Sequence, residues 1–367
     1  MTRWFVIAFC LGLVCPAMSR AQDAPPAAAE PEAPRLATPE AAYEFLTGLF
    51  RPLTQTEVER VERMLRDAMA AHPDDPRWPT AIVLLSRYTP NISDAAPLAR
   101  RVVETNPTSP NSWFALGVYL STGGSATPTM EQVERTKAAI KSIDNTINLD
   151  ATHVGALEMA AEYHTSAPAG AGGSRTRAIE LTDAMMAIKP VRWRGAELRA
   201  RICMVTQDWE GVDEWFARGI EWAPDQTIER DLRMQQALLY LNFRREYEGA
   251  LQLALPYADD GHVDADRFSF VVGQAAYRLG DCDLAITHYQ RVLDAGNPPP
   301  NAMLELADCL QRGGQLEAAA EVIERFLERF PGHPKERDVK LTLNTIRTMI
   351  AAQARTSPGS ASPPPSR

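Results

Sequence analysis

A period of about 34 residues, a length typical of stacked helical repeats, runs through most of this chain of 367 residues. Its clearest marks are prolines: Pro73 and Pro107 are separated by one such period, and so are Pro190 and Pro224. Proline has no backbone N–H and its ring clashes with the preceding turn, so each of these prolines is expected to follow the end of a helix. A repeat of this length predicts stacked helix pairs, each of which buries its apolar face against its neighbours.

The spacing divides the body of the chain into eight helix pairs and one last helix. The expected pairs span residues 39–73, 76–107, 110–151, 154–190, 193–224, 227–263, 266–297 and 300–331. The first begins with Thr38 as a helix N-cap and Pro39 at the first helical position. Residues 334–355 are expected to form an unpaired helix that covers the last apolar face. Ala151 and His262 stand where the third and sixth pairs lack the closing proline, so those two boundaries are the least defined.

Small and large residues alternate within the repeats in a way that suits close helix packing. Small residues allow the two helices of a pair to approach, and larger ones fill the space toward the next pair. The small positions are Gly117, Ala161, Gly273 and Ala307, and the large ones are Leu65, Phe216, Tyr289 and Ile323.

The turn inside each pair also has a recurring sequence. Gly280-Asp281-Cys282-Asp283-Leu284-Ala285 and Gly314-Gln315-Leu316-Glu317-Ala318-Ala319 have the same form, and Trp113, Leu116, Gly117 and Leu120 follow the pattern of a first helix. On these residues the body of the chain resembles the tetratricopeptide repeat family. The resemblance implies an all-α fold, a right-handed α-solenoid of about eight helix pairs with a C-terminal capping helix. It also implies that the first helix of each pair, helix A, lines a groove that binds an extended peptide or a partner's helix.

The family pattern assigns particular side chains to this groove. The set mixes arginines, amides and aromatic rings, which can hold a peptide backbone or a terminal carboxylate. The predicted partner-binding residues are Arg194, Arg201, Asn242, Arg267, Phe270, Gln274, Tyr277, Asn301 and Arg312, with Glu197, Gln235 and Asp308 at neighbouring groove positions.

Two glycine-rich stretches, 121–128 and 168–177, are the main candidates for a small-molecule site in an enzyme. The second contains Gly170-Ala171-Gly172-Gly173-Ser174, but it lacks the Gly-Lys-Ser/Thr ending of a phosphate-binding loop and no strand precedes it. Lengthened turns are the favoured interpretation. The histidines have no metal-binding spacing such as His-Glu-x-x-His. We therefore expect no catalytic residue, no metal and no cofactor.

Cysteines and tryptophans raise two further questions. Cys282 is expected at the start of one helix and Cys309 late in the next helix A, which runs antiparallel, so the two can form a disulfide. The alternative is two separately buried thiols, and Cys203 is expected to stay free in either case. Trp215 and Trp222 are less constrained by the repeat pattern than their neighbours, and they are either core residues or an exposed aromatic contact patch.

The first residues have the features of a secretory signal peptide, residues 1–21. Arg3 supplies the positive charge, residues 4–14 form a short apolar run, and Ser19-Arg20-Ala21 offers a cleavage site. Residues 22–37 form a linker rich in proline and alanine, the repeats occupy 38–355, and residues 356–367 form a tail rich in serine and proline. We expect a periplasmic or secreted protein with no transmembrane segment once the signal is removed.

Charge narrows the expected partners. The net charge is −9, and loss of Arg3 and Arg20 with the signal takes it to −11. An acidic chain is a poor general binder of nucleic acid, so proteins or peptides are the expected partners. The leading hypothesis is an exported protein-binding scaffold or adaptor in cell-envelope assembly or maintenance. The alternatives are a structural subunit of an envelope complex, or an enzyme with a small-molecule site at the two glycine-rich stretches.

The cleavage site predicts the mature N-terminus. Intact-mass analysis of the exported protein should show a chain that begins at Gln22, because Ser19 and Ala21 are the small residues that the signal peptidase requires. A lipid-modified N-terminal cysteine, Cys10 or Cys15, would contradict this prediction.

Overall fold

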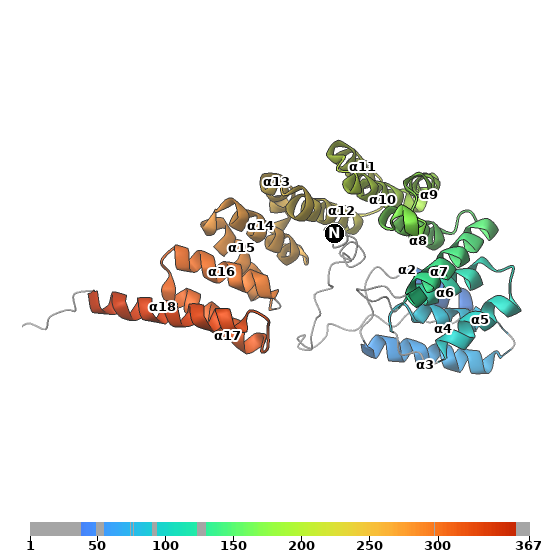
Figure 1. Cartoon of the computed structure of the whole chain (residues 1–367), viewed down its shortest axis with the longest axis horizontal. Helices are drawn as coiled ribbons and strands as arrows, with labels where there is room; N and C mark the ends of the chain where they lie inside the picture. The colour runs from blue at the N-terminus through green and yellow to red at the C-terminus, as the bar shows by residue number, and fades with distance from the viewer. Residues whose placement is uncertain are drawn as a thin grey trace, which may run out of the picture. The chain divides into compact units, whose positions relative to one another are not determined.

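The computed structural model describes residues 38–48, 55–73, 75, 77–89, 94–122, 130–296 and 298–356. The predicted signal peptide, the linker, most of the stretch 121–128 and the tail beyond residue 356 lie outside these ranges. Within the described ranges all regular structure is helical and no strand occurs, which confirms the predicted all-α fold of helix pairs (Figure 1).

The chain divides into two compact units, one ending at Pro224 and one beginning at Asp225, and each is described by itself. The helices of the first unit are α2 (Pro39–Gly48), α3 (Gln55–Ala71), α4 (Arg77–Leu85), α5 (Ala95–Thr105), α6 (Pro110–Ser121), α7 (Met130–Leu149), α8 (Val154–Ser166), α9 (Arg175–Ala187), α10 (Arg192–Val205) and α11 (Trp209–Glu221), with short 3₁₀ turns at Ala169–Ala171 and Lys189–Val191. The helices of the second unit are α12 (Gln226–Leu239), continued by the π-helical turn η3 (Tyr240–Arg244), α13 (Tyr247–Ala258), α14 (Ala265–Leu279), α15 (Cys282–Asp294), α16 (Pro300–Arg312), α17 (Leu316–Arg329) and α18 (Glu336–Thr356).

Most helices pack in consecutive pairs, and within each unit one pair packs on the next. In the first unit α6 pairs with α7, α8 with α9 and α10 with α11, and the second helix of one pair also contacts the first helix of the following pair. In the second unit α14 pairs with α15 and α16 with α17, and α18 covers α17. Val339, Leu343 and Ile346 of α18 are buried there, as expected for a capping helix.

The first repeat differs from the predicted helix pair. Over the described residues of both helices, α2 does not pack along α3; each of the two packs instead on α4. The buried residues of α3 are Val58, Val61 and Leu65, which form one narrow stripe. A single apolar stripe of this kind can pack against one neighbouring helix but not two. On α3 that neighbour is α4, and α2 packs on α4 separately.

The turns between helix A and helix B share a residue in the left-handed conformation. Gly280 and Gly314 have φ values of 82° and 73°, and the equivalent residues Gln207 and Arg245 have 59° and 58°. Glycine adopts this conformation without steric cost, whereas a residue with a Cβ adopts it at some expense. The recurring glycine of the turn motif is therefore a backbone requirement, and the chain meets it at Gln207 and Arg245 without glycine.

The second unit also holds a covalent link between repeats. Cys282 begins α15 and Cys309 lies near the end of α16, and the two are joined as a disulfide with their Cα atoms 5.1 Å apart. Cys203 is buried in α10 outside this bond.

Gly273 shows how tightly the helices of one pair approach. A Cβ at this position would lie 2.8 Å from two ring carbons of Tyr289, whose side chain is fully buried. The ring is rigid and enclosed, so it has no room to move aside. The small residue in α14 and the large residue in α15 are thus fitted to each other.

Gly273→Ala should lower the free energy of unfolding by about 1–2 kcal/mol, because overpacking costs about 1–3 kcal/mol and the better helix propensity of alanine returns up to about 1 kcal/mol. Gly313→Ala is the matched control, since its Cβ would meet nothing closer than 3.5 Å and the backbone φ is −77°. The control should be neutral or slightly stabilising. Equal stability of the two variants in urea unfolding would show that the contact is not a constraint.

Candidate functional site

Helices α8 and α10, two successive A helices of the first unit, share a network of ion pairs. Arg194 Nε donates to Glu158 Oε1 at 3.1 Å, and Arg194 also pairs with Glu197 on its own helix. Arg201 Nη2 lies 2.6 Å from Glu197 Oε1, and Arg201 Nη1 lies 3.5 Å from Glu162 Oε1. Three carboxylates thus alternate with two guanidinium groups.

Glu197 is the centre of this network and is fully buried, with 0% of its side chain exposed. Burial alone would raise the pKa of its carboxyl, but Arg194 and Arg201 outweigh burial and hold the pKa below its ordinary value. The expectation that Glu197 lines an open groove is therefore wrong. Arg194 and Arg201 compensate this buried charge, so both also support the fold.

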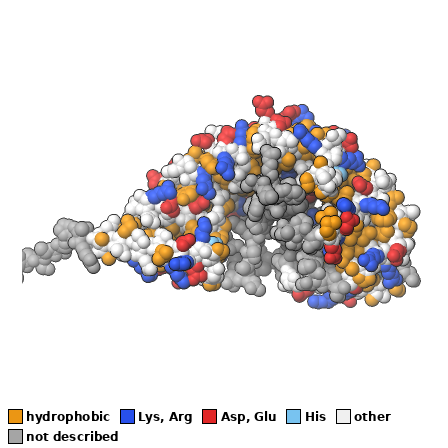
Figure 2. Space-filling view, viewed as in Figure 1, with side chains coloured by type: hydrophobic (Ala, Val, Ile, Leu, Met, Phe, Trp, Pro, Cys, Tyr) orange, Lys and Arg blue, Asp and Glu red, His pale blue; other side chains and the backbone are white. Residues whose placement is uncertain are grey.

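Several of these pairs join residues one repeat apart. Glu158 and Arg194 are separated by 36 residues, and so are Asp231 and Arg267 in the second unit, whose Oδ1 and Nη1 atoms lie 3.4 Å apart. Equivalent positions of successive repeats are neighbours in a solenoid, so opposite charges at this spacing meet. Figure 2 shows acidic and basic side chains interspersed on the visible face.

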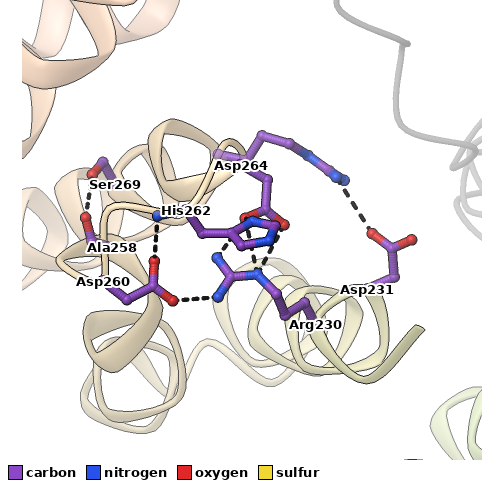
Figure 3. A network of polar contacts seen from close by, with 8 residues as sticks. Arg230, Asp231, Ala258, Asp260, His262, Asp264 and Ser269 are labelled. Carbon is purple, nitrogen blue, oxygen red and sulfur yellow. Dashed lines mark hydrogen bonds and ion pairs between the residues drawn. The ribbon is translucent and has the colours of Figure 1, made fainter. Parts of the chain in front are cut away.

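A second network holds the turn between α13 and α14, and Figure 3 shows its members. Arg230 of α12, with only 1% of its side chain exposed, donates from Nε to both carboxylate oxygens of Asp264, at 2.9 and 3.1 Å, and pairs with Asp260. Its guanidinium carbon also lies 5.2 Å from the ring centre of Tyr257 and 5.1 Å from that of Phe268. The two carboxylates neutralise the positive charge of Arg230, and the two aromatic rings contact its guanidinium group as cation–π partners.

His262, which replaces the closing proline, takes part in the same turn. Its Nδ1 lies 2.8 Å from Asp264 Oδ1, and its backbone N–H donates to Asp260 Oδ1 at 3.0 Å. The bond from Arg230 lowers the pKa of Asp260. Burial alone would raise the pKa of Asp264, but Arg230 and His262 outweigh it and the net shift is downward. The sixth repeat is therefore closed by a buried arginine and two aspartates instead of by proline.

The helix-A surface of α14 and α16 is more open. Tyr277 Oη donates to Asp308 Oδ2 at 2.9 Å, and Arg312 Nη2 lies 2.7 Å from the same oxygen. The guanidinium carbon of Arg312 lies 5.6 Å from the ring centre of Tyr277, and the Arg312 side chain is 56% exposed. The structure thus brings together three residues that the family pattern assigned to the groove.

A recess of about 200 Å³ adjoins this cluster, between α16, α17 and α18. Its lining is mainly apolar, with the polar side chains of Asp308, Gln311 and Thr342 among the lining residues. The lining residues are Leu304, Ala307, Asp308, Gln311, Ile323, Val339 and Thr342. Asp308 belongs both to the recess and to the cluster with Tyr277 and Arg312, so the two form one continuous surface.

The remaining predicted groove residues differ in accessibility. Arg267 and Asn242 are exposed, and Asn242 lies in the π-helical turn η3. Phe270 is half-buried against the apolar core of the second unit. Gln274, Asn301 and Gln235 are half-buried as well.

The stretch 168–177 is a compact turn. Tyr163 Oη donates to the Ala171 carbonyl, and Gly172 is left-handed with φ of 94°. Gly173 lies so close to the Ala167 carbonyl that no Cβ would fit between them. Ser174 caps α9 by accepting from the backbone N–H of Arg177 at 3.3 Å. The other stretch, 121–128, lies mostly outside the described residues, and so would a pocket shared by the two.

The two tryptophans in question are both half-buried rather than fully exposed. Trp215 contacts two arginines, Arg199 and Arg218, whose guanidinium carbons lie 5.2 and 4.6 Å from its ring centre. Trp222 faces Arg192 at 4.9 Å. An arginine therefore covers part of each tryptophan side chain, which is neither fully buried nor fully exposed.

Two further findings concern the described residues only. They contain no cluster of three or more histidine, cysteine, aspartate or glutamate side chains placed to hold a metal ion. They also contain no helix with the length and apolar character needed to cross a membrane.

Part of the second unit is similar in sequence to a known repeat family. The sequence profile described as Tetratricopeptide repeat matches residues 270–334. No curated protein sequence matches the chain.

Solved structures show the same architecture. Yeast Tom70 aligns with a TM-score of 0.54 at 10% identity, over 97% of this chain and 71% of that one. The human IFIT1 dimer with m7Gppp-AAAA aligns with a TM-score of 0.54 at 13% identity, over 84% of this chain and 72% of that one. At these identities the likeness concerns the fold alone.

Arg230→Ala should destabilise the protein by at least about 2 kcal/mol. This is somewhat less than the roughly 3–5 kcal/mol typical of a broken buried pair, because Asp260 and Asp264 remain partly solvated. Arg233→Ala is the matched control, since Arg233 lies on the same helix, also faces Tyr257 and pairs with Glu229 near the surface. The control should cost less than about 1 kcal/mol.

The effect of Arg230→Ala should depend on pH. The pKa values of Asp260 and Asp264 are lowered in the folded protein, so the stability they contribute is present above the ordinary aspartate pKa of 3.8 and is lost as the pH falls below it. Urea unfolding at neutral pH and near pH 3 should show the gap between wild type and variant narrowing in acid. A gap that does not change with pH would rule out the carboxylates as its cause.

Proposed function

We propose that this tetratricopeptide repeat protein is a scaffold or adaptor that holds partner proteins or peptides on the helix-A surface of its repeats. The observation that carries the proposal is the surface formed by Tyr277, Asp308, Arg312 and the adjoining recess. It combines an exposed charged group, an aromatic ring and an apolar hollow, which is the mixture that peptide recognition uses.

The chemistry of this surface suits a peptide with an apolar side chain. A volume of about 200 Å³ accommodates a side chain rather than a cofactor, since ligand pockets are usually larger. Arg312 carries five N–H donors, and its pairing with Asp308 leaves donors that can reach a backbone carbonyl or a carboxylate. The apolar lining would supply affinity, and the polar side chains of Asp308, Gln311 and Thr342 would fix the direction of the bound chain.

We further propose that the protein works outside the cytoplasm, in the periplasm, in cell-envelope assembly or maintenance. The support is the signal-like sequence of residues 1–21, together with the pairing of Cys282 and Cys309, since disulfides persist in oxidising compartments. Proteins or peptides are the proposed partners, because the net charge of −9 disfavours nucleic acid. IFIT1, which was solved with m7Gppp-AAAA, shares only the fold. We expect no catalytic activity.

One observation favours a second candidate function, that of a structural subunit. On α18 the side chains of Leu341 and Met349 are 59% and 41% exposed, two turns apart on one helix. Apolar residues on the outer side of a capping helix suit contact with another protein. In that case the partner would bind the end of the repeat array rather than helix A.

Arg312→Ala should weaken partner capture at least about tenfold in crosslinking pull-downs from the envelope fraction, while the thermal midpoint moves little, because exposed ion pairs contribute little to stability. Arg218→Ala is the matched control: Arg218 forms an equivalent pair, at 2.6 Å from Glu214, but on a helix B. The control should retain full capture.

Capture by Arg312→Ala at the level of the control would contradict the groove proposal. If Leu341→Ser with Met349→Ser abolished capture instead, the structural-subunit function would take its place.

A further inference from the structure

Helix α2 packs on one A helix and reaches the next two repeats through the side chain of Tyr43. It packs on α4, its Tyr43 ring lies 6.5 Å from the Phe114 ring of α6, and the Tyr43 hydroxyl lies 2.7 Å from Nε2 of His153, the N-cap residue of α8. A regular helix A stacks on its own helix B and on the next helix A. Contact with three repeats in succession is what a ligand in the groove makes.

The contacts of α2 are specific and well buried. Ala42 and Leu46 are almost completely buried, and the Leu46 carbonyl accepts a hydrogen bond from the Tyr88 hydroxyl at 2.7 Å. His153 Nδ1 accepts from the Ala156 backbone N–H at 3.1 Å. The proton of the neutral ring is therefore on Nε2, which donates to the Tyr43 oxygen. A small residue, a tyrosine and a leucine at positions i, i+1 and i+4 of α2 are its anchors.

Among the side chains of α2 that the structure describes, few apart from these anchors are buried. The helix has 10 residues, a length at which an isolated helix is not stable in water, and it does not form a hairpin with α3. Glu40 at its start pairs with Arg77 on the surface of α4. Its position thus depends on a few side chains that face α4, α6 and the start of α8.

We infer that α2 is an internal ligand of the groove formed by α4, α6 and the N-terminus of α8, and that this groove binds an amphipathic helix with a small residue, a tyrosine and a leucine at i, i+1 and i+4. A partner helix of this chemistry would displace α2. The covalent connection gives α2 a high effective concentration, so the partner must compete with it. This surface belongs to the first unit, whereas Arg312 and the recess belong to the second, so either proposal can fail alone.

The test uses the full chain and a labelled peptide with the sequence of residues 37–49. Tyr43→Ala with Leu46→Ala in the chain should release α2 and leave the groove vacant. Fluorescence anisotropy should then show the peptide binding to this variant at least about tenfold more tightly than to wild type, because the competent fraction of the groove has increased. The matched controls are a peptide with the same two substitutions, which should not bind, and Glu40→Gln in the chain, which should behave as wild type.

Hydrogen exchange separates release of α2 from loss of the core. In wild type, the amides of α2 should exchange at least about tenfold faster than those of α4 and α6, since an internal ligand opens without its groove. In the double variant, α4 and α6 should stay protected. If α2 exchanges together with α4 and α6, or if the variant exposes all three helices, α2 is an integral part of the core and the inference is wrong. A folded variant that does not bind the peptide would overturn it equally.

Discussion

Every repeat in this protein depends on contact with its neighbours, because a single pair of helices leaves one apolar face in water. The contact distances are set by small residues. At Gly273 the helix backbone approaches the Tyr289 ring so closely that no Cβ would fit without a shift. That approach allows the next helix, α16, to contact both α14 and α15, and the core of the second unit follows from it. The order of helices, the position of the groove surface and the capping function of α18 all depend on this requirement.

Charged residues act at the same repeat boundaries. The pairs Glu158–Arg194 and Asp231–Arg267 each join neighbouring repeats, and the buried Arg230 joins α12 to the turn before α14. The pairs of Arg194 and Arg230 are largely buried, and such pairs add little net stability, but a misaligned repeat would leave their charges uncompensated. They consequently select one alignment of the repeats. Arg312 is the most exposed of the predicted groove arginines.

The sequence predicts the helix pairs well because their signals are local. Proline ends helices, glycine allows the left-handed turn at Gly280 and Gly314, and small residues mark the close approaches. The groove residues were harder to predict because exposure depends on pairing between side chains. Nothing local distinguishes Glu197, which is buried, from Asp308, which is accessible.

Two features, the buried Arg230 and the position of helix α2, depend on contacts that the repeat pattern does not predict. The buried Arg230 had a weak signal, an arginine one repeat length before Asp264 in a repeat that lacks its closing proline. Helix α2 had none, because its sequence fits a regular first helix and only the contacts of Tyr43 with Phe114 and His153 reveal its different position.

The disulfide has a mechanical consequence. A solenoid pulled from its ends loses its repeats one after another, starting where the contacts are fewest. Cys282 and Cys309 are 27 residues apart in sequence and are joined across a repeat boundary. While the bond is intact, the segment between them cannot extend, and on the order of 90 Å of chain is withheld from the stretched molecule. The length to which the second unit can be stretched therefore depends on whether the bond between Cys282 and Cys309 is formed or reduced.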